Sequence, residues 1–456
     1  MVKNILFTIL VILPLSGFSK DLSFCERSEA VKTQIETLLN KKCDQIQTND
    51  LGKIWELNLR SRSIRNLKTE DFSGLVNLKQ LYLEHNQIEN LPEGIFRDLS
   101  QLEGLFLNNN QFSRIFENTF KGLISLRVLA IEGNNLSVIE NGSFDQLSKL
   151  SSLRLGGNSL TEIPETLFSK LSLVQEVSLA KNKITRLPTS VFQGLHKLRY
   201  VLLYDNQISE IHPDLFKDQI EFESLYLNNN QLASLSPDVL KNKKIKDLGL
   251  SNNLIADISD IFSKVKDINA LALTNNKIQS IPDGTFAKLN NIERLFLSQN
   301  QIRSLGNNSL ISLRKLKHLD LSQNLIEHIP NQLFSNLTNI ESISLRHNKI
   351  NNLPMYAFHQ LNKLEYINLN YNELITLPNA LFKAKAQRKE FLDIKLEYNK
   401  ITQIPKTVFD GTTIDINKTI VRLAGNPLTE ETKTMLIGQL QEAALFEEWG
   451  IPDGGY

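Results

Sequence analysis

Hydrophobic and polar positions recur along most of the chain with a period of 24 residues. Each unit contains the pattern L-x-L-x-x-N-x-[IL], and its alternating leucines place both side chains on one face of a short strand. The segment Leu57–Ile64 forms one further unit, with Arg62 in place of the asparagine. The pattern therefore predicts sixteen short strands. The pattern asparagines are Asn86, Asn110, Asn134, Asn158, Asn182, Asn206, Asn230, Asn253, Asn276, Asn300, Asn324, Asn348, Asn372, Asn399 and Asn426.

Two further positions carry the same residue type in many units, and we call each such aligned position a column. Most units carry a phenylalanine ten residues after the asparagine, and many carry a proline six residues after it. Proline cannot donate to a strand ladder, so it ends the regular pairing. The asparagine side chain can donate and accept at once, and can satisfy backbone groups of its own unit and the next. One unit cannot bury its leucines and phenylalanine alone, so the units must stack with their strands in one long parallel sheet.

These columns resemble the leucine-rich repeat family in its 24-residue form with a phenylalanine spine. The resemblance implies an α/β leucine-rich repeat solenoid with a curved parallel β-sheet on the concave face. It also implies irregular or short helical segments on the convex face and helical caps at both ends. We expect a signal peptide at 1–19, an N-terminal cap with a disulfide at 20–50, about 16 repeats at 51–428, and a C-terminal helical cap and tail at 429–456.

The first residues have the composition of a secretory signal peptide. Lys3 precedes the apolar run Ile5–Leu13, and the small residues Gly17 and Ser19 predict cleavage before Lys20. The apolar run is too short to span a bilayer as a stable helix. We therefore expect a secreted, extracellular protein without a membrane span, with the periplasm and the cell surface as alternative locations.

Cys25 and Cys43 are the two cysteines of the chain. In an oxidising compartment we expect them to pair. Closing a loop of 18 residues stabilises the fold by about 3 kcal/mol on the chain-entropy model. The segment around them resembles the N-terminal cap of secreted bacterial leucine-rich repeat proteins and lacks the cysteine clusters of animal receptors. Five N-x-[ST] sequons keep an animal-type receptor ectodomain or matrix protein open as an alternative.

Charge and composition exclude several classes of partner. Fifty-one basic and 50 acidic side chains give a net charge of +1, so the chain lacks the overall basic footprint of nucleic-acid or anionic-membrane binding. Two cysteines exclude a cysteine-rich zinc module. We therefore expect no nucleic-acid partner, no cofactor and no bound metal, and we expect a monomer.

Tyrosine is concentrated where the strands should face the concave surface. Seven of the nine tyrosines fall just before, between or just after the paired leucines. Tyrosine favours strands in general, but it also offers a large amphipathic contact area and is enriched in binding hot spots. The sequence thus predicts a non-enzymatic recognition protein that binds an extracellular protein or glycan. The predicted contact residues are Tyr82, Phe106, Tyr200, Tyr204, Tyr226, Phe296, Tyr366, Tyr371 and Tyr398.

Small residues separate the aromatic groups and predict shallow dents between them. The first patch includes Ser152, Gly156 and Ser178, and a second lies between Tyr226 and Phe296. An enzyme inhibitor using the same concave surface is an alternative function. A hydrolase is a remoter one, because one predicted strand carries a histidine and an aspartate and the next carries two serines. These residues are His318, Asp320, Ser342 and Ser344.

Overall fold

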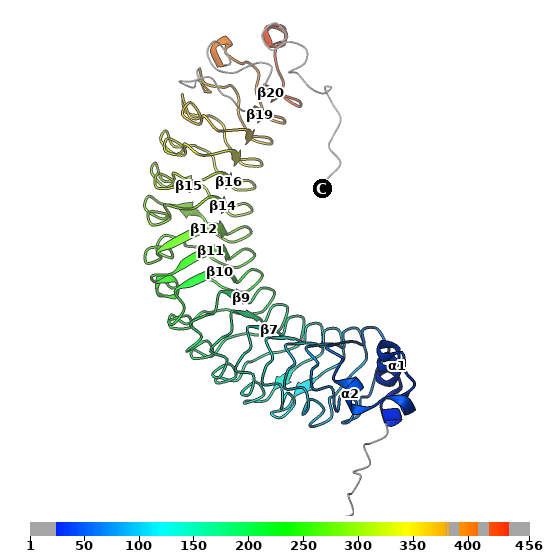
Figure 1. The fold of residues 1–456 in the computed structure, drawn as a ribbon. Helices are drawn as coiled ribbons and strands as arrows, with labels where there is room; N and C mark the ends of the chain where they lie inside the picture. The colour runs from blue at the N-terminus through cyan, green and yellow to red at the C-terminus, as the bar shows by residue number, and fades with distance from the viewer. Residues whose placement is uncertain (1–23, 380, 383–391, 409–418, 437–456) are drawn as a thin grey trace, which may run out of the picture.

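The computed structural model describes residues 24–379, 381–382, 392–408 and 419–436. The predicted signal peptide at 1–19 and the end of the predicted C-terminal cap lie outside these residues. The described chain winds into a curved solenoid (Figure 1), and one 16-stranded parallel sheet runs along its length. The strands follow one another in chain order, one for each unit of the sequence pattern. The predicted leucine-rich repeat solenoid is confirmed.

The strands of the long sheet are mostly three residues long. They are β1 (Glu56–Asn58), β2 (Gln80–Tyr82), β3 (Gly104–Phe106), β5 (Val128–Ala130), β7 (Ser152–Arg154), β8 (Glu176–Ser178), β9 (Tyr200–Leu202), β10 (Glu221–Tyr226), β11 (Lys244–Gly249), β12 (Asp267–Ala272), β14 (Arg294–Phe296), β16 (His318–Asp320), β17 (Ser342–Ser344), β18 (Tyr366–Asn368), β19 (Leu392–Lys395) and β20 (Thr419–Arg422). Two short sheets pair β4 (Arg114–Ile115) with β6 (Val138–Ile139), and β13 (Ser280–Ile281) with β15 (Ser304–Leu305). Turns and the 3-10 helices η3 (Pro237–Leu240) and η4 (Lys406–Val408) make up much of the remaining connections.

The pattern asparagines form a continuous ladder beside the sheet. Asn110 accepts from the backbone N–H of Ile88 at 3.0 Å and donates to the carbonyls of Leu83 and Leu107 at 2.9 and 3.1 Å. The same arrangement recurs from Asn86 to Asn426. Each asparagine thus satisfies buried backbone groups in its own repeat, as predicted, and in the preceding repeat rather than the next one.

The phenylalanine column forms the opposite wall of the core. Neighbouring rings lie 5.5–6.4 Å apart in eight described pairs, from Phe72–Phe96 to Phe358–Phe382. Phe262 belongs to this spine although its repeat is one residue short. Leu240 and Leu310 occupy the column in two other repeats and are fully buried, so the predicted ring is not present in every coil.

The regular geometry changes in the two 23-residue repeats and in the repeat that precedes them. Here β10, β11 and β12 extend to six residues, and polar side chains replace the buried leucine that follows the spine by three residues. Gln219 Nε2 donates to the carbonyls of Phe192 and Leu195 at 2.9 and 3.1 Å. Lys243 Nζ makes the corresponding bonds one repeat later, to Phe216 at 2.7 Å and to Gln219 at 2.9 Å. These donors serve carbonyls of the preceding repeat, and burial lowers the pKa of Lys243 to about 8.

A helical segment covers the first repeat. It comprises η1 (Phe24–Glu26), α1 (Glu29–Leu39), η2 (Cys43–Gln45) and α2 (Thr48–Leu51). Val31 and Ile35 of α1 are fully buried in the common core, whereas Leu38 is 48% exposed. Leu38 lies on the solvent side because the helix contacts the coil along a narrow stripe only.

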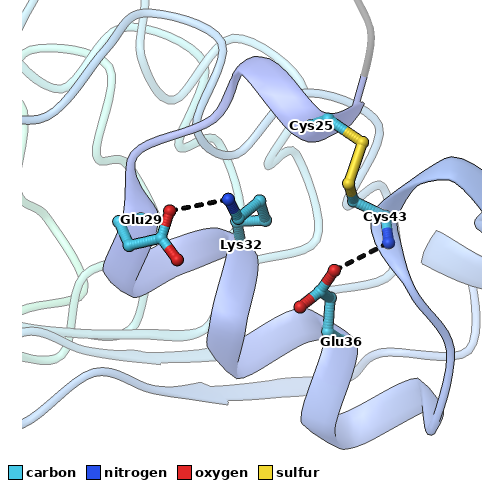
Figure 2. The surroundings of a disulfide bond; sticks show 5 residues. All are labelled: Cys25, Glu29, Lys32, Glu36 and Cys43. Carbon is cyan, nitrogen blue, oxygen red and sulfur yellow. Dashed lines mark hydrogen bonds and ion pairs between the residues drawn. A yellow bond between two sulfur atoms is a disulfide. The ribbon is translucent and has the colours of Figure 1, made fainter.

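The predicted disulfide joins Cys25 to Cys43 (Figure 2). It links η1 to η2 across the end of α1, and Glu36 of that helix accepts from the backbone N–H of Cys43 at 2.7 Å. Arg62, which replaces the first ladder asparagine, donates instead to Gln34 of α1 at 2.8 Å. Arg62 thus ties the first coil to the helix, while the backbone of this coil still bonds the second coil at Tyr82 and Asn86.

At the other end, residues 430–436 are helical. Thr429 precedes this helix, and its hydroxyl accepts from the backbone N–H of Thr432 at 3.3 Å, as an N-cap residue does. Leu436 is buried against the last described coil. Among the residues that the structure describes, no helix has the length and apolar content needed to cross a bilayer.

Candidate recognition surface

The strand register lines up one residue of each repeat on the exposed side of the sheet. Residues between the paired apolar positions face one another across neighbouring strands, as Tyr82 does with Phe106 and Tyr226 with Gly249. This central column reads Asn58, Tyr82, Phe106, Ala130, Arg154, Ser178, Leu202, Tyr226, Gly249, Ala272, Phe296, Asp320, Ser344, Asn368, Lys395 and Arg422.

An aromatic pair lies at the N-terminal end of the face. The rings of Tyr82 and Phe106 stack with centroids 4.9 Å apart and planes 11° from parallel. Arg60 covers the Tyr82 ring at 3.9 Å and also bonds Glu84 at 2.9 Å. The two predicted contact residues are therefore held in one fixed unit, which we call the N-terminal aromatic pair.

The predicted aromatic residues of the middle repeats stay apart. Tyr200 is 41% exposed, while Tyr204, Tyr226 and Phe296 are half-buried. Within the described chain, none of these four rings stacks on another aromatic side chain. The structure therefore keeps these four predicted contact residues separate from one another.

A second aromatic group lies near the C-terminal end of the sheet. The rings of His347, Tyr371 and Tyr398 come from three consecutive repeats, with centroids 4.3 and 4.6 Å apart and planes 14° and 10° from parallel. Arg346 lies over the Tyr371 ring at 5.1 Å. Burial, and then the charge of Arg346, lower the pKa of His347, which keeps its ring neutral at neutral pH. We call these three rings the C-terminal aromatic stack.

Tyr366 is not part of this stack. Its hydroxyl accepts from Asn368 at 2.9 Å, and the Lys395 ammonium lies 5.4 Å from the ring centroid. Of the nine predicted contact residues, the structure thus brings Tyr82 together with Phe106 and Tyr371 together with Tyr398.

The C-terminal aromatic stack occupies an unfavourable backbone position. The residue before each ladder asparagine has a positive φ, and His347, Tyr371 and Tyr398 have φ of 55°, 56° and 57°. Glycine, asparagine and aspartate fill most of the other repeats there, because this left-handed region costs larger side chains about 1–2 kcal/mol. Gly425 follows in the next repeat, where a Cβ would lie 2.7 Å from Cδ1 of Tyr398. His347 was not among the predicted contact residues, although a ring at a position suited to asparagine or glycine is a signal in the sequence.

The predicted dent between the aromatic groups has a charged floor. Ser152 and Ser178 are buried, and Ser152 donates to Glu176 at 2.8 Å. Arg154 makes a two-pronged ion pair with Glu176, with both N–O distances 3.0 Å. Burial raises the pKa of the neighbouring Glu132. The small residues therefore accommodate a cross-strand ion pair rather than an apolar hollow.

The described residues of the hydrolase alternative do not form a hydrogen-bonded catalytic arrangement. His318 faces Ser342 and Asp320 faces Ser344 across β16 and β17, and Nε2 of His318 lies 3.9 Å from a carboxylate oxygen of Glu341. In the described part of the chain, no hydrogen bond joins His318 to either serine. No three histidine, cysteine or acidic side chains of the described residues converge as metal ligands.

Several solved structures are similar to this chain. A leucine-rich repeat protein of Leptospira interrogans is 25% identical, with a TM-score of 0.72 over 86% of this chain and 95% of its own. A plant peptide hormone receptor, RGFR1, in complex with RGF2 is 25% identical, with a TM-score of 0.62 over 82% of this chain and 59% of its own. The Drosophila Toll–Spatzle complex shares the fold, at 24% identity and a TM-score of 0.73 over 85% of this chain, which spans 53% of the Toll chain.

No curated protein sequence matches the chain. A family model described as a leucine-rich repeat matches eight overlapping segments. These are residues 52–112, 81–136, 101–160, 124–183, 148–208, 172–219, 266–326 and 314–374. The matched segments cover more than half of the sequence and contain most of the asparagine ladder and most of the phenylalanine spine. The chain belongs to the leucine-rich repeat family.

Proposed function

We propose that the protein is a secreted, monomeric, non-enzymatic recognition protein that binds an extracellular protein or glycan on the concave face of its solenoid. The observation that carries this proposal is the C-terminal aromatic stack. Three consecutive repeats hold His347, Tyr371 and Tyr398 in left-handed backbone that glycine or asparagine would adopt at lower cost. Strain of this kind persists at functional sites, where the exposed side chain contributes to binding.

The relatives support this class of function. The plant receptor of similar fold is described in complex with RGF2, and the Toll structure in complex with Spatzle. The N-terminal aromatic pair and the C-terminal aromatic stack supply Tyr, Phe and Arg, which are side chains favoured at binding hot spots. The setting that fits a secreted recognition protein is contact with a host, prey or neighbouring cell.

The binding proposal is tested with two variants of the full chain. Tyr82→Ala with Phe106→Ala removes the N-terminal aromatic pair, and Tyr371→Ala with Tyr398→Ala removes the C-terminal aromatic stack. We expect at least one double variant to lose binding to intact target cells that retain the wild-type protein. His359→Ala, on an exposed segment away from both groups, is the matched control. Equal retention of both double variants, with unchanged circular dichroism, would refute the concave site.

Secretion has its own test. The intact mass of the protein recovered from culture medium should correspond to a chain that begins at Lys20 with Cys25 and Cys43 joined. A chain that keeps its first residues and stays inside the cell contradicts the proposed location.

A further inference from the structure

Two parallel rows of polar side chains lead along the solenoid to the C-terminal aromatic stack. They occupy the two positions directly before the ladder asparagine in five consecutive repeats, and we call them the polar track. The first row consists of Asn228, Ser251, Thr274, Ser298 and Ser322, and the second of Asn229, Asn252, Asn275, Gln299 and Gln323.

Backbone hydrogen bonds place the track and the stack in one line. The N–H of each second-row residue donates to the carbonyl of the first-row residue one repeat later, at 2.8–3.0 Å from Asn229 to Gln299. Gln323 continues the series to Arg346 at 2.7 Å, and His347 and Tyr371 continue it to the next two repeats at 2.9 Å each. The aromatic stack is therefore the direct continuation of the second row.

The track presents hydrogen-bonding groups without charge. All five second-row side chains are exposed, and none of the ten positions carries Asp, Glu, Lys or Arg, although 22% of the chain is charged. Some of the groups already bond within the track, as Asn275 Nδ2 does to Asn252 at 2.7 Å and Thr274 to Ser298 at 3.2 Å. A carboxamide has two donors and two acceptor sites, so these bonds leave capacity for a ligand.

Backbone conformation explains only part of this composition. Asparagine is favoured in left-handed backbone, which accounts for Asn229, Asn252 and Asn275. Gln299 and Gln323 adopt the same left-handed backbone, with φ of 55° and 52°, although glutamine does not share the preference of asparagine for it. Their side chains point to a requirement for long carboxamides at these two repeats.

We propose that the polar track and the C-terminal aromatic stack bind an uncharged polysaccharide that lies along the repeats, across the strands. This inference rests on the proposed function and names its ligand. Adjacent repeats are about 4.8 Å apart, the spacing of neighbouring strands, and this matches the repeat of an extended sugar chain closely enough for one repeat to meet one sugar. A neutral sugar chain offers closely spaced hydroxyls that donate and accept, as the carboxamides and hydroxyls of the track do.

The aromatic stack adds phenol hydroxyls that can donate to and accept from sugar hydroxyls. Both faces of the Tyr371 ring are covered, by His347 and Tyr398, so the stack presents ring edges and phenol hydroxyls to a ligand. A protein partner fits the track less well, because the centre of a protein interface is enriched in aromatic residues, Met and Arg and depleted of Ser.

The test is native gel electrophoresis of the full chain in gels that contain hydroxyethyl cellulose, mannan or dextran, with heparin as the charged comparison. We expect retardation by at least one neutral polysaccharide. Gln299→Glu with Gln323→Glu keeps the side-chain shape and replaces donors by carboxylates, and should weaken the apparent affinity about tenfold or more. Asn109→Asp is the control, because Asn109 has the same backbone position, with φ of 56°, outside the track.

The outcomes separate this inference from the proposed function. Retardation that is lost in the double Glu variant and kept in Asn109→Asp supports the polysaccharide site. Retardation by heparin alone, or equal retardation of both variants, overturns it. If Tyr371→Ala with Tyr398→Ala loses cell binding while no neutral polysaccharide retards the wild type, the inference fails and the proposed function stands. If neither cells nor polysaccharides bind, both fail.

Discussion

Removing a ladder asparagine from the middle of the solenoid should be strongly destabilising. In Asn182→Ala the backbone N–H of Leu160 loses the acceptor that now lies 3.0 Å away, and the described chain offers it no second one. The carbonyls of Leu155 and Leu179 lose donors at 3.1 and 3.0 Å, but each also accepts from a second ladder asparagine at 3.0 Å. One orphaned buried donor costs about 1–3 kcal/mol and each of the two shared bonds about 0.5–1.5 kcal/mol, which gives about 2–6 kcal/mol in total.

Urea unfolding measures this loss for the whole chain, and hydrogen exchange of the Leu160 amide measures it locally. Local exchange is needed because repeat proteins can open by parts rather than in one step. Asn118→Ala is the control, because this asparagine is exposed and should change the free energy of unfolding by less than about 0.5 kcal/mol. Equal unfolding midpoints for the two variants, with unchanged Leu160 protection, would refute the assignment of the ladder as a main source of stability.

Three other changes test separate parts of the fold. Burial lowers the pKa of Lys243 from 10.5 to about 8. Between these pH values the folded chain binds fewer protons than the unfolded chain, so its stability should rise with pH. Lys243→Met should flatten this rise in urea midpoints measured from pH 7.5 to 10. Cys25→Ser with Cys43→Ser should destabilise the N-terminal segment by about 3 kcal/mol, seen as faster exchange in α1 with little change in the central repeats. Tyr356 has φ of 66° where other repeats carry glycine, so Tyr356→Gly should raise the free energy of unfolding by about 1 kcal/mol in the same urea assay.

Most of the architecture could be predicted from the sequence, because each structural role belongs to one residue column. The Leu pairs predict strands, and the ladder asparagine meets the same three backbone groups in repeat after repeat. The pairing of Cys25 with Cys43 was predictable because the chain has no other cysteine. The strands and the asparagine ladder recur so often that their period in the sequence is enough to predict them.

The parts that escaped prediction depend on contacts between repeats. Gln219 and Lys243 appear in the sequence as polar residues at an otherwise apolar position, and only the packing of neighbouring repeats shows the carbonyls that they serve. The ion pair of Arg154 with Glu176 occupies the place where the small residues of the sequence predicted a dent. Neither contact has a local sequence signature, because the partners are about one repeat apart.

The aromatic residues show how one repeat geometry gives different arrangements of surface side chains. Neighbouring strands hold equivalent side chains at a fixed separation, so a single tyrosine in one repeat remains isolated, as Tyr200 does, while rings in adjacent repeats stack, as Tyr371 and Tyr398 do. Such a stack needs no new backbone, only substitutions at one column in consecutive repeats. Because the ladder asparagine fixes the backbone on both sides of that column, the left-handed strain is absorbed by the scaffold. Stability therefore resides in the buried columns, and the exposed position before the ladder asparagine is the one at which we propose that the ligand is selected.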